Sequence, residues 1–349
     1  MSSKIIDRIV KDSGFPGLVD FLAEDLSASD LQSLLLHVQQ RRAAQVSEAG
    51  LMRGSERPLV RAADIDARLF HLFDHVAFAT AREFEAVELS PVSPFGVNKA
   101  LGDIDQNNVL STTRNADVAG DPTVGMALEC ARRRRTNPAI VRLCNSHRVV
   151  RLQPFDDPDF RPHFRLFSIV TAGRDSGSRQ FETGALNHHL RFYLLLFRNL
   201  NEVGFVLQNP LVELSDTALI QQFIPAVDDH SVRAHLHGGS ERFLEKHGIT
   251  PPEVVPALAY LEKEVFDALR TQFPEAQFRF NLARLEGVNY YSGVTLRISP
   301  MAPDGQRHAI VDGGFTNWTA RLLQNRKERL LTSGIGSEFT CRRYRNSEA

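Results

Sequence analysis

The sequence predicts an α+β fold, with a mainly antiparallel sheet flanked by helices and an N-terminal helical extension. Two strand-like runs, 140–151 and 163–170, are joined by a polar loop rich in Pro and Asp, which is typical of an antiparallel pair. Three more strand candidates, 277–282, 290–298 and 308–311, follow near the end of the chain. Because these strands are not each followed by a helix, the pattern argues against a doubly wound parallel sheet.

Composition narrows the class of protein. The chain has 349 residues, 42% hydrophobic and 24% charged, as in soluble globular proteins with a sizeable core. The formal net charge of −1 gives no global basic field for nucleic acid. Three widely spread cysteines fit a reducing compartment better than a disulfide framework or a zinc site. No signal-peptide core or membrane-length apolar run is present, so we expect a cytoplasmic location.

The N-terminal region is expected to be helical over 3–48, with a break at Phe15–Gly17 and N-caps at Ser27–Asp30. A linker is expected at Ser47–Pro58. We therefore divide the chain into an N-terminal helical extension, 1–55, and a main domain, 56–349. The apolar faces of the extension are expected to pack on the main domain or on a partner.

Hydrophobic spacing gives the remaining elements. Helices are expected over 64–84, 122–135, 181–197, 253–272 and 316–323, and short strands over 84–89, 107–112, 203–207 and 211–214. Gly313 and Gly314 are expected to end the strand that begins at His308. The mixed charges at Arg326–Arg329 favour a solvated helix face.

Arginines flank the polar loop between the two central runs. Arg148 lies where the chain leaves the first run, and Arg165 where it enters the second. Guanidinium groups placed in this way suit a phosphate or a carboxylate, because each offers a rigid fork of donors. An ordinary hairpin whose arginines face water is the alternative, and the local pattern alone favours it.

Two histidine-containing segments suggest other sites. Asp228–His230 and His235–His237 combine ligand types that bind metals, although a polar loop explains them better, and we expect no metal site. His188 and His189 lie on an apolar helix, where one of them is expected to be a hydrogen-bonded core residue.

Several segments together resemble the catalytic domain of a class II aminoacyl-tRNA synthetase, most closely the histidyl-tRNA synthetase branch. The strand that stops at Ser90–Pro91 is similar to the first family motif, and the pair around Arg148 and His163–Phe167 is similar to the second. Leu110–Arg114 and Glu286–Gly293 resemble two substrate-contacting segments. Asp312–Phe315, followed by Gly334–Glu338, resembles the glycine-rich third motif. The likeness spans roughly 60–345.

The resemblance implies a site that holds ATP with Mg²⁺ and activates a small carboxylic acid on the α-phosphate, which requires cations around the reacting groups. It implies catalytic roles for Arg148 and Arg114. Nucleotide contacts are implied for His163, Arg165, Phe167, Glu338 and Arg342. The substrate pocket is implied to contain Asp117, Glu286, Asn289, Tyr290, Tyr291, Gly313 and Gly314.

Departures from the family pattern leave two hypotheses open. Glu286 replaces an arginine, Asn289 replaces an aspartate, and we expect no anticodon-binding domain, so charging of tRNA with histidine is not expected. The first hypothesis is a paralogue that binds a nucleotide and a small amino or carboxylic acid and adenylates it for transfer to an amine, a carrier or RNA. The second is a non-catalytic regulatory or scaffold subunit, similar to that of ATP phosphoribosyltransferase, with a protein partner. Both imply a homodimer; RNA stays open as a partner, and a membrane is not expected.

Overall fold

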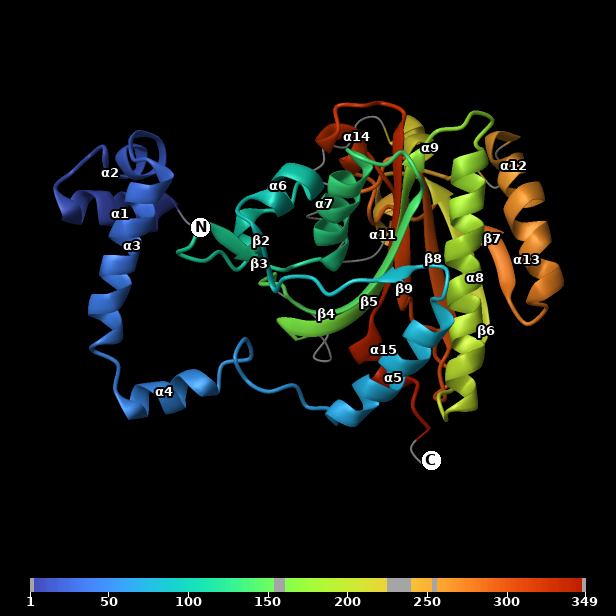
Figure 1. The fold of residues 1–349 in the computed structure, drawn as a ribbon, viewed down its shortest axis with the longest axis horizontal. Coiled ribbons are helices and arrows are strands. Elements are labelled where there is room, and N and C mark those ends of the chain that lie inside the picture. The colour runs from blue at the N-terminus through green and yellow to red at the C-terminus, as the bar shows by residue number, and fades with distance from the viewer. Residues whose placement is uncertain (1–2, 154–160, 225–239, 253–255, 347–349) are drawn as a thin grey trace. The chain divides into compact units, whose positions relative to one another are not determined.

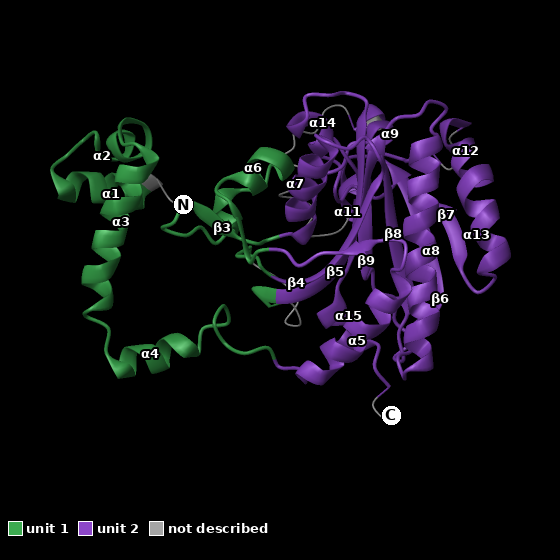
Figure 2. Cartoon of the chain, in the orientation of Figure 1, with its two compact units in different colours: residues 1–63, 90–120, 149–163 green, residues 64–89, 121–148, 164–349 purple. Residues whose placement is uncertain are grey.

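The computed structural model describes residues 3–153, 161–224, 240–252 and 256–346, and the expected Asp228–His230 and His235–His237 segments lie outside them. The chain forms two compact units (Figure 2). Unit 1 contains 1–63, 90–120 and 149–163, and unit 2 contains 64–89, 121–148 and 164–349.

Unit 1 begins with helices. They are α1 (Ser3–Ser13), α2 (Leu18–Asp20), the π-helical segment η1 (Phe21–Asp25), α3 (Ala28–Ala43) and α4 (Glu48–Ser55). Ser27 caps α3, because its side chain accepts a hydrogen bond from the Asp30 amide, as the sequence predicts. The expected linker at Ser47–Pro58 is wrong, since most of it forms α4 behind a Ser47 cap.

The rest of unit 1 is a small hairpin with a helix. Strands β2 (Val92–Pro94) and β3 (Ala116–Val118) pair antiparallel, and α6 (Val97–Gly102) lies between them in sequence. The expected strand over 107–112 is wrong: the 3₁₀ helix η2 (Gln106–Asn108) starts there, and β3 begins only after Arg114. Asp117 organises this hairpin from a completely buried position.

Unit 2 is built on an eight-stranded sheet with the order β1-β4-β5-β10-β9-β8-β6-β7 (Figure 1). Pairing is antiparallel along β5, β10, β9, β8 and β6, and parallel for β1 with β4 and for β6 with β7. The strands are β1 (Glu85–Ala86), β4 (Val141–Val150), β5 (His163–Arg174), β6 (Gln208–Asp216), β7 (Gln277–Phe280), β8 (Val294–Met301), β9 (Val311–Thr316) and β10 (Glu328–Ile335). The predicted mainly antiparallel α+β fold is confirmed.

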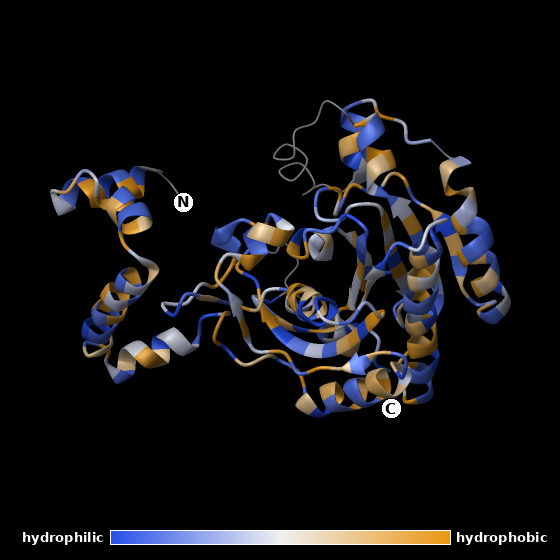
Figure 3. Ribbon diagram, turned by 45° about the horizontal axis from the view of Figure 1, so that its top comes forward, coloured by the Kyte–Doolittle hydropathy of each residue, from blue (hydrophilic) through white to orange (hydrophobic). Residues whose placement is uncertain are grey.

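Helices α5 (Ala67–Thr80) and α8 (Gln180–Glu202) pack against each other, and α8 also packs on β10. The apolar residues of α8 recur along one side, as its alternating orange and blue bands show (Figure 3). Phe192 of α8 stacks on Phe167 of β5 with ring centroids 5.7 Å apart, and Phe78 of α5 meets the same ring edge-on at 5.1 Å. This helix-covered side of the sheet, called the helical face below, carries the main hydrophobic core.

Further helices complete unit 2. Helices α7 (Pro122–Arg134) and α14 (Trp318–Leu322) contact β10 and each other, and α15 (Ser337–Arg343) packs on α5. The remaining helical segments are α9 (Thr217–Phe223), α11 (Ser240–Lys246), η4 (Pro256–Leu258), α12 (Ala259–Leu261), η5 (Glu262–Phe266) and α13 (Asp267–Gln272). No helix in the described ranges has the length and apolar character that a bilayer crossing requires.

Three expectations about unit 2 are corrected. Gly313 and Gly314 lie inside β9 rather than ending a strand, because β9 starts at Val311 and continues to Thr316. The charges of Arg326–Arg329 lead into strand β10, not along a helix. No strand forms over 203–207, where Phe205 makes only an isolated bridge to Arg345.

Candidate functional site

The side of the sheet opposite the helical face carries polar residues. Cross-strand partners share a face, and one row joins Glu213, Arg297, Asp312, Gly334 and Ser168 across β6, β8, β9, β10 and β5. The next row on the same side contains Ser215, Thr295, Gly314 and Thr332. We call this side the polar face. An interior sheet surface with so many polar side chains is the candidate functional site.

Arginines on or beside the polar face are paired with carboxylates. Arg284, after β7, donates to Asp312. The Arg297 guanidinium lies 3.4 Å from the Glu286 carboxylate. Arg279 of β7 donates to Glu213 at 2.6 Å, and the Asn281 side chain donates to the same oxygen at 2.8 Å. The formal charges of the arginines and carboxylates in these pairs cancel.

Arg284 is the most enclosed of these cations, with 3% of its surface exposed. Its guanidinium also donates to the Leu296 carbonyl at 3.2 Å. Burial lowers the pKa of Arg284, but Asp312, Tyr291 and Glu286 together raise it more, and the net pKa lies above the ordinary value. Arg284 therefore remains charged and holds the start of the 284–291 segment against the sheet.

Tyr291 packs on the polar face at a glycine. A Cβ added to Gly314 would lie 2.7 Å from the Tyr291 ring, so only glycine leaves room for the ring here. Gly287, with φ +85°, lies on the other side of the ring, and a Cβ there would also approach to 2.7 Å. The Tyr291 ring fills the space beside Gly314, and the expected contact of Gly314 with a substrate stays a prediction.

Gly313 has a different neighbour. A Cβ there would lie 2.4 Å from the Ser333 Cβ and 2.6 Å from the Thr332 carbonyl oxygen. Gly313 therefore permits close packing of β9 against β10, and its expected contact with a substrate stays a prediction. Asn289 is exposed, within 3.5 Å of the Gln221 side chain.

Tyr290 connects the same segment to α7. Its hydroxyl donates to Asp121 at 2.9 Å, and its ring meets Trp318 edge-on at 5.2 Å. Burial and the Asp121 carboxylate raise the pKa of Tyr290 well above its usual range. Asp121 also caps α7, so one carboxylate joins the start of this helix to the 284–291 segment.

Several buried polar atoms around the polar face make no hydrogen bond among the described residues. They are the hydroxyls of Ser168, Ser215 and Thr316, the Nε atoms of Arg284 and Arg297, and Oε2 of Glu286, which has only its ion pair with Arg297. An unsatisfied buried polar group costs about 1–3 kcal/mol. Such groups on one surface indicate a place where a polar ligand would supply the missing partners.

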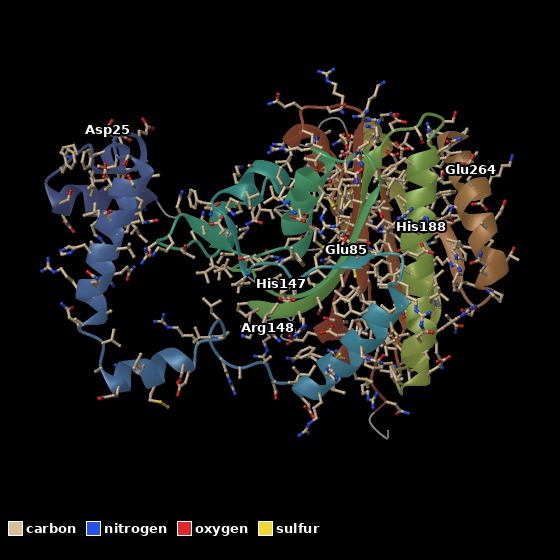
Figure 4. All side chains as sticks on the ribbon, viewed as in Figure 1. Asp25, Glu85, His147, Arg148, His188 and Glu264 are labelled. Atoms are coloured by element: carbon tan, nitrogen blue, oxygen red, sulfur yellow. The ribbon has the colours of Figure 1, made fainter. Side chains whose placement is uncertain are left out.

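Arg148 and Arg165 lie together, but on the helical face. Their guanidinium carbons stand 5.5 Å and 5.7 Å from the centre of the Phe70 ring of α5. Arg165 pairs with Asp74 of α5 at 2.9 Å and donates to Ser146 at the same distance. Burial raises the pKa of Asp74, although the bonds from Ser146 and Arg165 lower it. Figure 4 labels Arg148 and its neighbour His147 on β4.

Glu338 supplies the negative charge that pairs with Arg148 and Arg342. The Glu338 carboxylate lies 3.2 Å from the Arg148 guanidinium and 3.0 Å from that of Arg342. Only 4% of Glu338 is exposed. Glu338 therefore joins α15 to β4 in an ion-pair network rather than facing the polar side of the sheet.

Other expected site residues are placed elsewhere. Phe167, for which a nucleotide contact is expected, is completely buried between Phe192 and Phe78. Asp117, which is expected in the substrate pocket, is also completely buried and accepts from the Gly96 amide and the Gln106 side chain. Arg114 is exposed in the turn before β3, and the His163 ring bonds the Arg61 carbonyl at 2.7 Å. Both belong to unit 1.

The sequence reasoning did not single out Arg284, Arg297 and Glu213. A signal for Arg297 was present, because Thr295, Arg297 and Ser299 alternate with Leu296 and Ile298 along β8, which is the period of a strand with one polar side. Arg284 has no such signal, since its partner Asp312 is distant in sequence.

Comparisons with known proteins identify the fold. No family model matches the chain, and no curated protein matches it. A solved ATP phosphoribosyltransferase regulatory subunit/histidyl-tRNA synthetase from Bacillus halodurans matches with a TM-score of 0.60 at 11% identity, covering 82% of each chain. The chain has a class II aminoacyl-tRNA synthetase-like fold.

Further matches support this assignment. Histidyl-tRNA synthetase from Nostoc sp. gives a TM-score of 0.57 at 17% identity, over 80% of this chain and 72% of the other. A histidine–tRNA ligase subunit from Alicyclobacillus acidocaldarius gives 0.59 at 14% identity, over 82% and 96%. The predicted resemblance to the histidyl-tRNA synthetase branch is thus confirmed for the class II synthetase-like fold.

Proposed function

We propose that this chain is a non-adenylating regulatory subunit that binds a small polar molecule of amino-acid size on the polar face. The single observation that carries the proposal is the pairing of Arg279, Arg284 and Arg297 with carboxylates of the chain itself. A site for a nucleoside triphosphate needs surplus positive charge. The three ion pairs of the polar face leave no surplus positive charge.

The residues expected to hold ATP and Mg²⁺ do not fit that role. Arg148 and Arg165 pair with Glu338 and Asp74 on the helical face, and Phe167 is inside the core. No group of three or more His, Cys, Asp or Glu in the described part of the chain is arranged to hold a metal. We derive no adenylation step for this chain.

Ligand binding is supported by the unsatisfied atoms. The Nε atoms of Arg284 and Arg297 are donors without a hydrogen-bond partner, and Glu286 Oε2 is an acceptor without one. A small molecule with both a carboxylate and an ammonium group would satisfy donors and acceptors of this kind. Hydrogen bonds to charged groups contribute about 1.5–3 kcal/mol each, enough to select such a ligand.

A regulatory role is supported by the comparison with the Bacillus halodurans protein, whose description joins a regulatory subunit and a synthetase. The fold thus serves a protein described as regulatory, and this chain is proposed to act through a protein partner and as a homodimer. Sedimentation of the purified protein over a concentration range tests the dimer.

Pyrophosphate exchange is the decisive experiment. The protein is incubated with ATP, Mg²⁺ and each of the twenty amino acids, and we expect no exchange of labelled pyrophosphate into ATP. Calorimetric titration with the same amino acids is expected to detect binding of at least one. Exchange with any amino acid overturns the proposal that the protein does not adenylate. Absence of binding to all twenty overturns the proposal that it binds a molecule of this kind.

A matched pair of variants places the ligand. Arg297→Gln is expected to weaken binding about tenfold or more, or ~1.4 kcal/mol, because it removes a charged donor from the polar face. Arg270→Gln is the control, since Arg270 pairs with Glu262 on an exposed helical segment of the same unit. Equal losses in both variants would argue against the polar face as the site.

A further inference from the structure

Unit 2 contains a cavity at the ends of several strands, apart from the polar face. Its volume is about 280 Å³, the size range of a small metabolite rather than of a nucleotide. The start of α8, the start of α9, the η4–α12 segment and the ends of β8, β9 and β10 all contribute to its wall. None of the residues proposed above for the polar-face ligand lines it.

One wall of this cavity is apolar. Leu219, Leu258, Val294 and Phe315 provide aliphatic and aromatic surface, and the Tyr260 ring lies beside them. The lining also contains four charged residues, Arg179, Glu182, Asp216 and Arg329. A cavity with an apolar wall and a few convergent charged groups has the form of a small-molecule site.

Glu182 supplies an unused acceptor. Its Oε1 accepts from Arg329 at 3.0 Å, whereas its Oε2 is buried and has no hydrogen-bond partner within the described ranges. A carboxylate oxygen buried without a donor is unfavourable by about 1–3 kcal/mol or more. This carboxylate therefore lacks one donor that a ligand can supply.

Asp216 presents a similar arrangement. Its Oδ1 accepts from the amides of Ala218 and Leu219 and so caps α9, while no hydrogen bond joins its Oδ2 to the described residues. Both carboxylates act on Tyr260: burial raises the pKa of its hydroxyl, as do Asp216 and Glu182, whereas Arg179 lowers it. The charged groups thus converge on one end of the cavity.

The cations of the cavity are already engaged. Arg329 donates to Glu182, to Asp175 at 2.7 Å and to the Arg326 carbonyl at 2.8 Å. The Arg179 guanidinium lies 4.0 Å from the centre of the Tyr260 ring. Counting Asp175 with Glu182 and Asp216, carboxylates outnumber guanidinium groups here, so the local charge favours a cation.

The backbone at the cavity mouth is held in an uncommon conformation. Ser178 and Arg179 have φ values of +51° and +58°, which lie in the left-handed region that L side chains rarely adopt. This conformation directs Arg179 toward Tyr260, because Arg179 immediately precedes α8. Strained residues of this kind persist where the surrounding contacts determine them, often at ligand sites.

We propose that this cavity binds a small organic cation, a primary ammonium compound whose ammonium group donates to Glu182 and Asp216 and whose apolar body packs on Leu219, Leu258 and Phe315. The site is independent of the polar-face ligand. Arg179 closes over Tyr260 beside it and adds a cation that disfavours more highly charged polyamines.

The test uses three probes of similar size and different charge: phenethylamine, phenethyl alcohol and 3-phenylpropionate. Binding to the full-length protein is followed by calorimetry and by saturation-transfer NMR. The amine is expected to bind at least tenfold more tightly than the alcohol, and the carboxylate is expected not to bind. Equal binding of all three, tighter binding of the carboxylate, or no binding of the amine overturns the proposal.

Two substitutions assign the binding to this cavity. Glu182→Gln keeps the acceptor for Arg329 but removes the charge, and Asp216→Asn keeps the acceptor that caps α9. Each is expected to weaken amine binding about tenfold or more while the melting temperature stays close to that of the parent. Glu202→Gln is the matched control at the exposed end of the same helix, where binding is expected to change less than twofold. If both cavity variants retain full affinity for the amine, the amine does not bind in this cavity and the proposal is wrong.

Discussion

Arg134 and Glu328 form an ion pair in which Nε lies 2.5 Å from Oε2 and the side chains are only 1% and 3% exposed. The pair joins the last turn of α7 to the first residue of β10. Arg134 also donates to the carbonyls of Pro138 and Ala139, at 3.0 Å and 2.5 Å. One guanidinium thus fixes a helix end, a loop and a strand.

Breaking this pair from one side is expected to destabilise the protein strongly. Glu328→Gln leaves a buried guanidinium without its counter-charge, which costs about 3–5 kcal/mol. Urea unfolding followed by circular dichroism measures the change. The control is Glu262→Gln, which breaks the Arg270 pair whose side chains are each 42% exposed, and should cost less than about 1 kcal/mol. Similar losses of unfolding free energy in the two variants would show that burial of the Arg134–Glu328 pair does not set its contribution to stability.

Gly314→Ala is expected to destabilise unit 2, because the new Cβ would meet the Tyr291 ring at 2.7 Å and the Thr295 methyl at 2.9 Å. A loss of about 1–3 kcal/mol follows from overpacking of this kind. Gly184→Ala is the control: nothing lies within 4 Å of that added Cβ. In the interior of α8 the same change should stabilise by about 0.5–1 kcal/mol. Opposite signs in the unfolding free energy are the expected result, and stabilisation by both changes contradicts it.

His189 makes stability depend on pH. Its ring bonds Ser333 at 2.7 Å and Thr171 at 3.0 Å, and burial lowers the pKa of His189 well below 6.5. The unfolded chain therefore binds a proton that the folded protein does not. The contribution of neutral His189 to the free energy of unfolding is fully present above pH 6.5. It falls as the pH drops below 6.5, by up to about 1.4 kcal/mol per pH unit.

The measurement compares variants, because burial also lowers the pKa of His147. His189→Gln should lower stability at pH 7.5 and flatten the fall between pH 6.5 and 5. His188→Gln is the neighbouring control, since the His188 ring pairs with Glu83 at 2.5 Å near the surface. An unchanged pH slope in His189→Gln would falsify this assignment.

The three thiols are expected to be unreactive in the folded protein. Cys130, Cys144 and Cys341 are all buried, and burial raises the pKa of each to about 12. Thiolate is the reactive form, so labelling with a disulfide reagent should be slow in native buffer and rapid in urea. Fast labelling of any of them before unfolding contradicts the burial.

Long periodic segments were predicted well from the sequence. The helix expected over 181–197 is α8, the one over 122–135 is α7, and the central strand pair is β4 with β5. In each, a single apolar pattern continues for many residues, so the local signal is strong. The strand expected over 84–89 forms only over the two residues of β1, Glu85 and Ala86, because so short a strand is defined by its partner β4 rather than by its own sequence.

The site was harder to predict from the sequence. The two-residue period of a strand shows which residues share a face, but not whether helices cover that face. Arg148, Arg165 and Phe167 were placed near one another correctly, but on the helical face, where Phe70, Asp74 and Phe192 contact them. The partner of Arg284 lies on another strand, and no local pattern links it to Asp312. Those pairings follow from topology, which a single sequence does not encode locally.

The position of β10 in the sheet has a consequence for synthesis on the ribosome. Among the described strands β10 is the last in chain order, yet it lies between β5 and β9 in the interior of the sheet. Until it emerges, β5 and β9 both present open edges, and exposed edges of this kind invite pairing with other chains. Productive folding of the sheet therefore awaits the emergence of β10, and a chaperone that shields the edges of β5 and β9 should raise the yield of native protein.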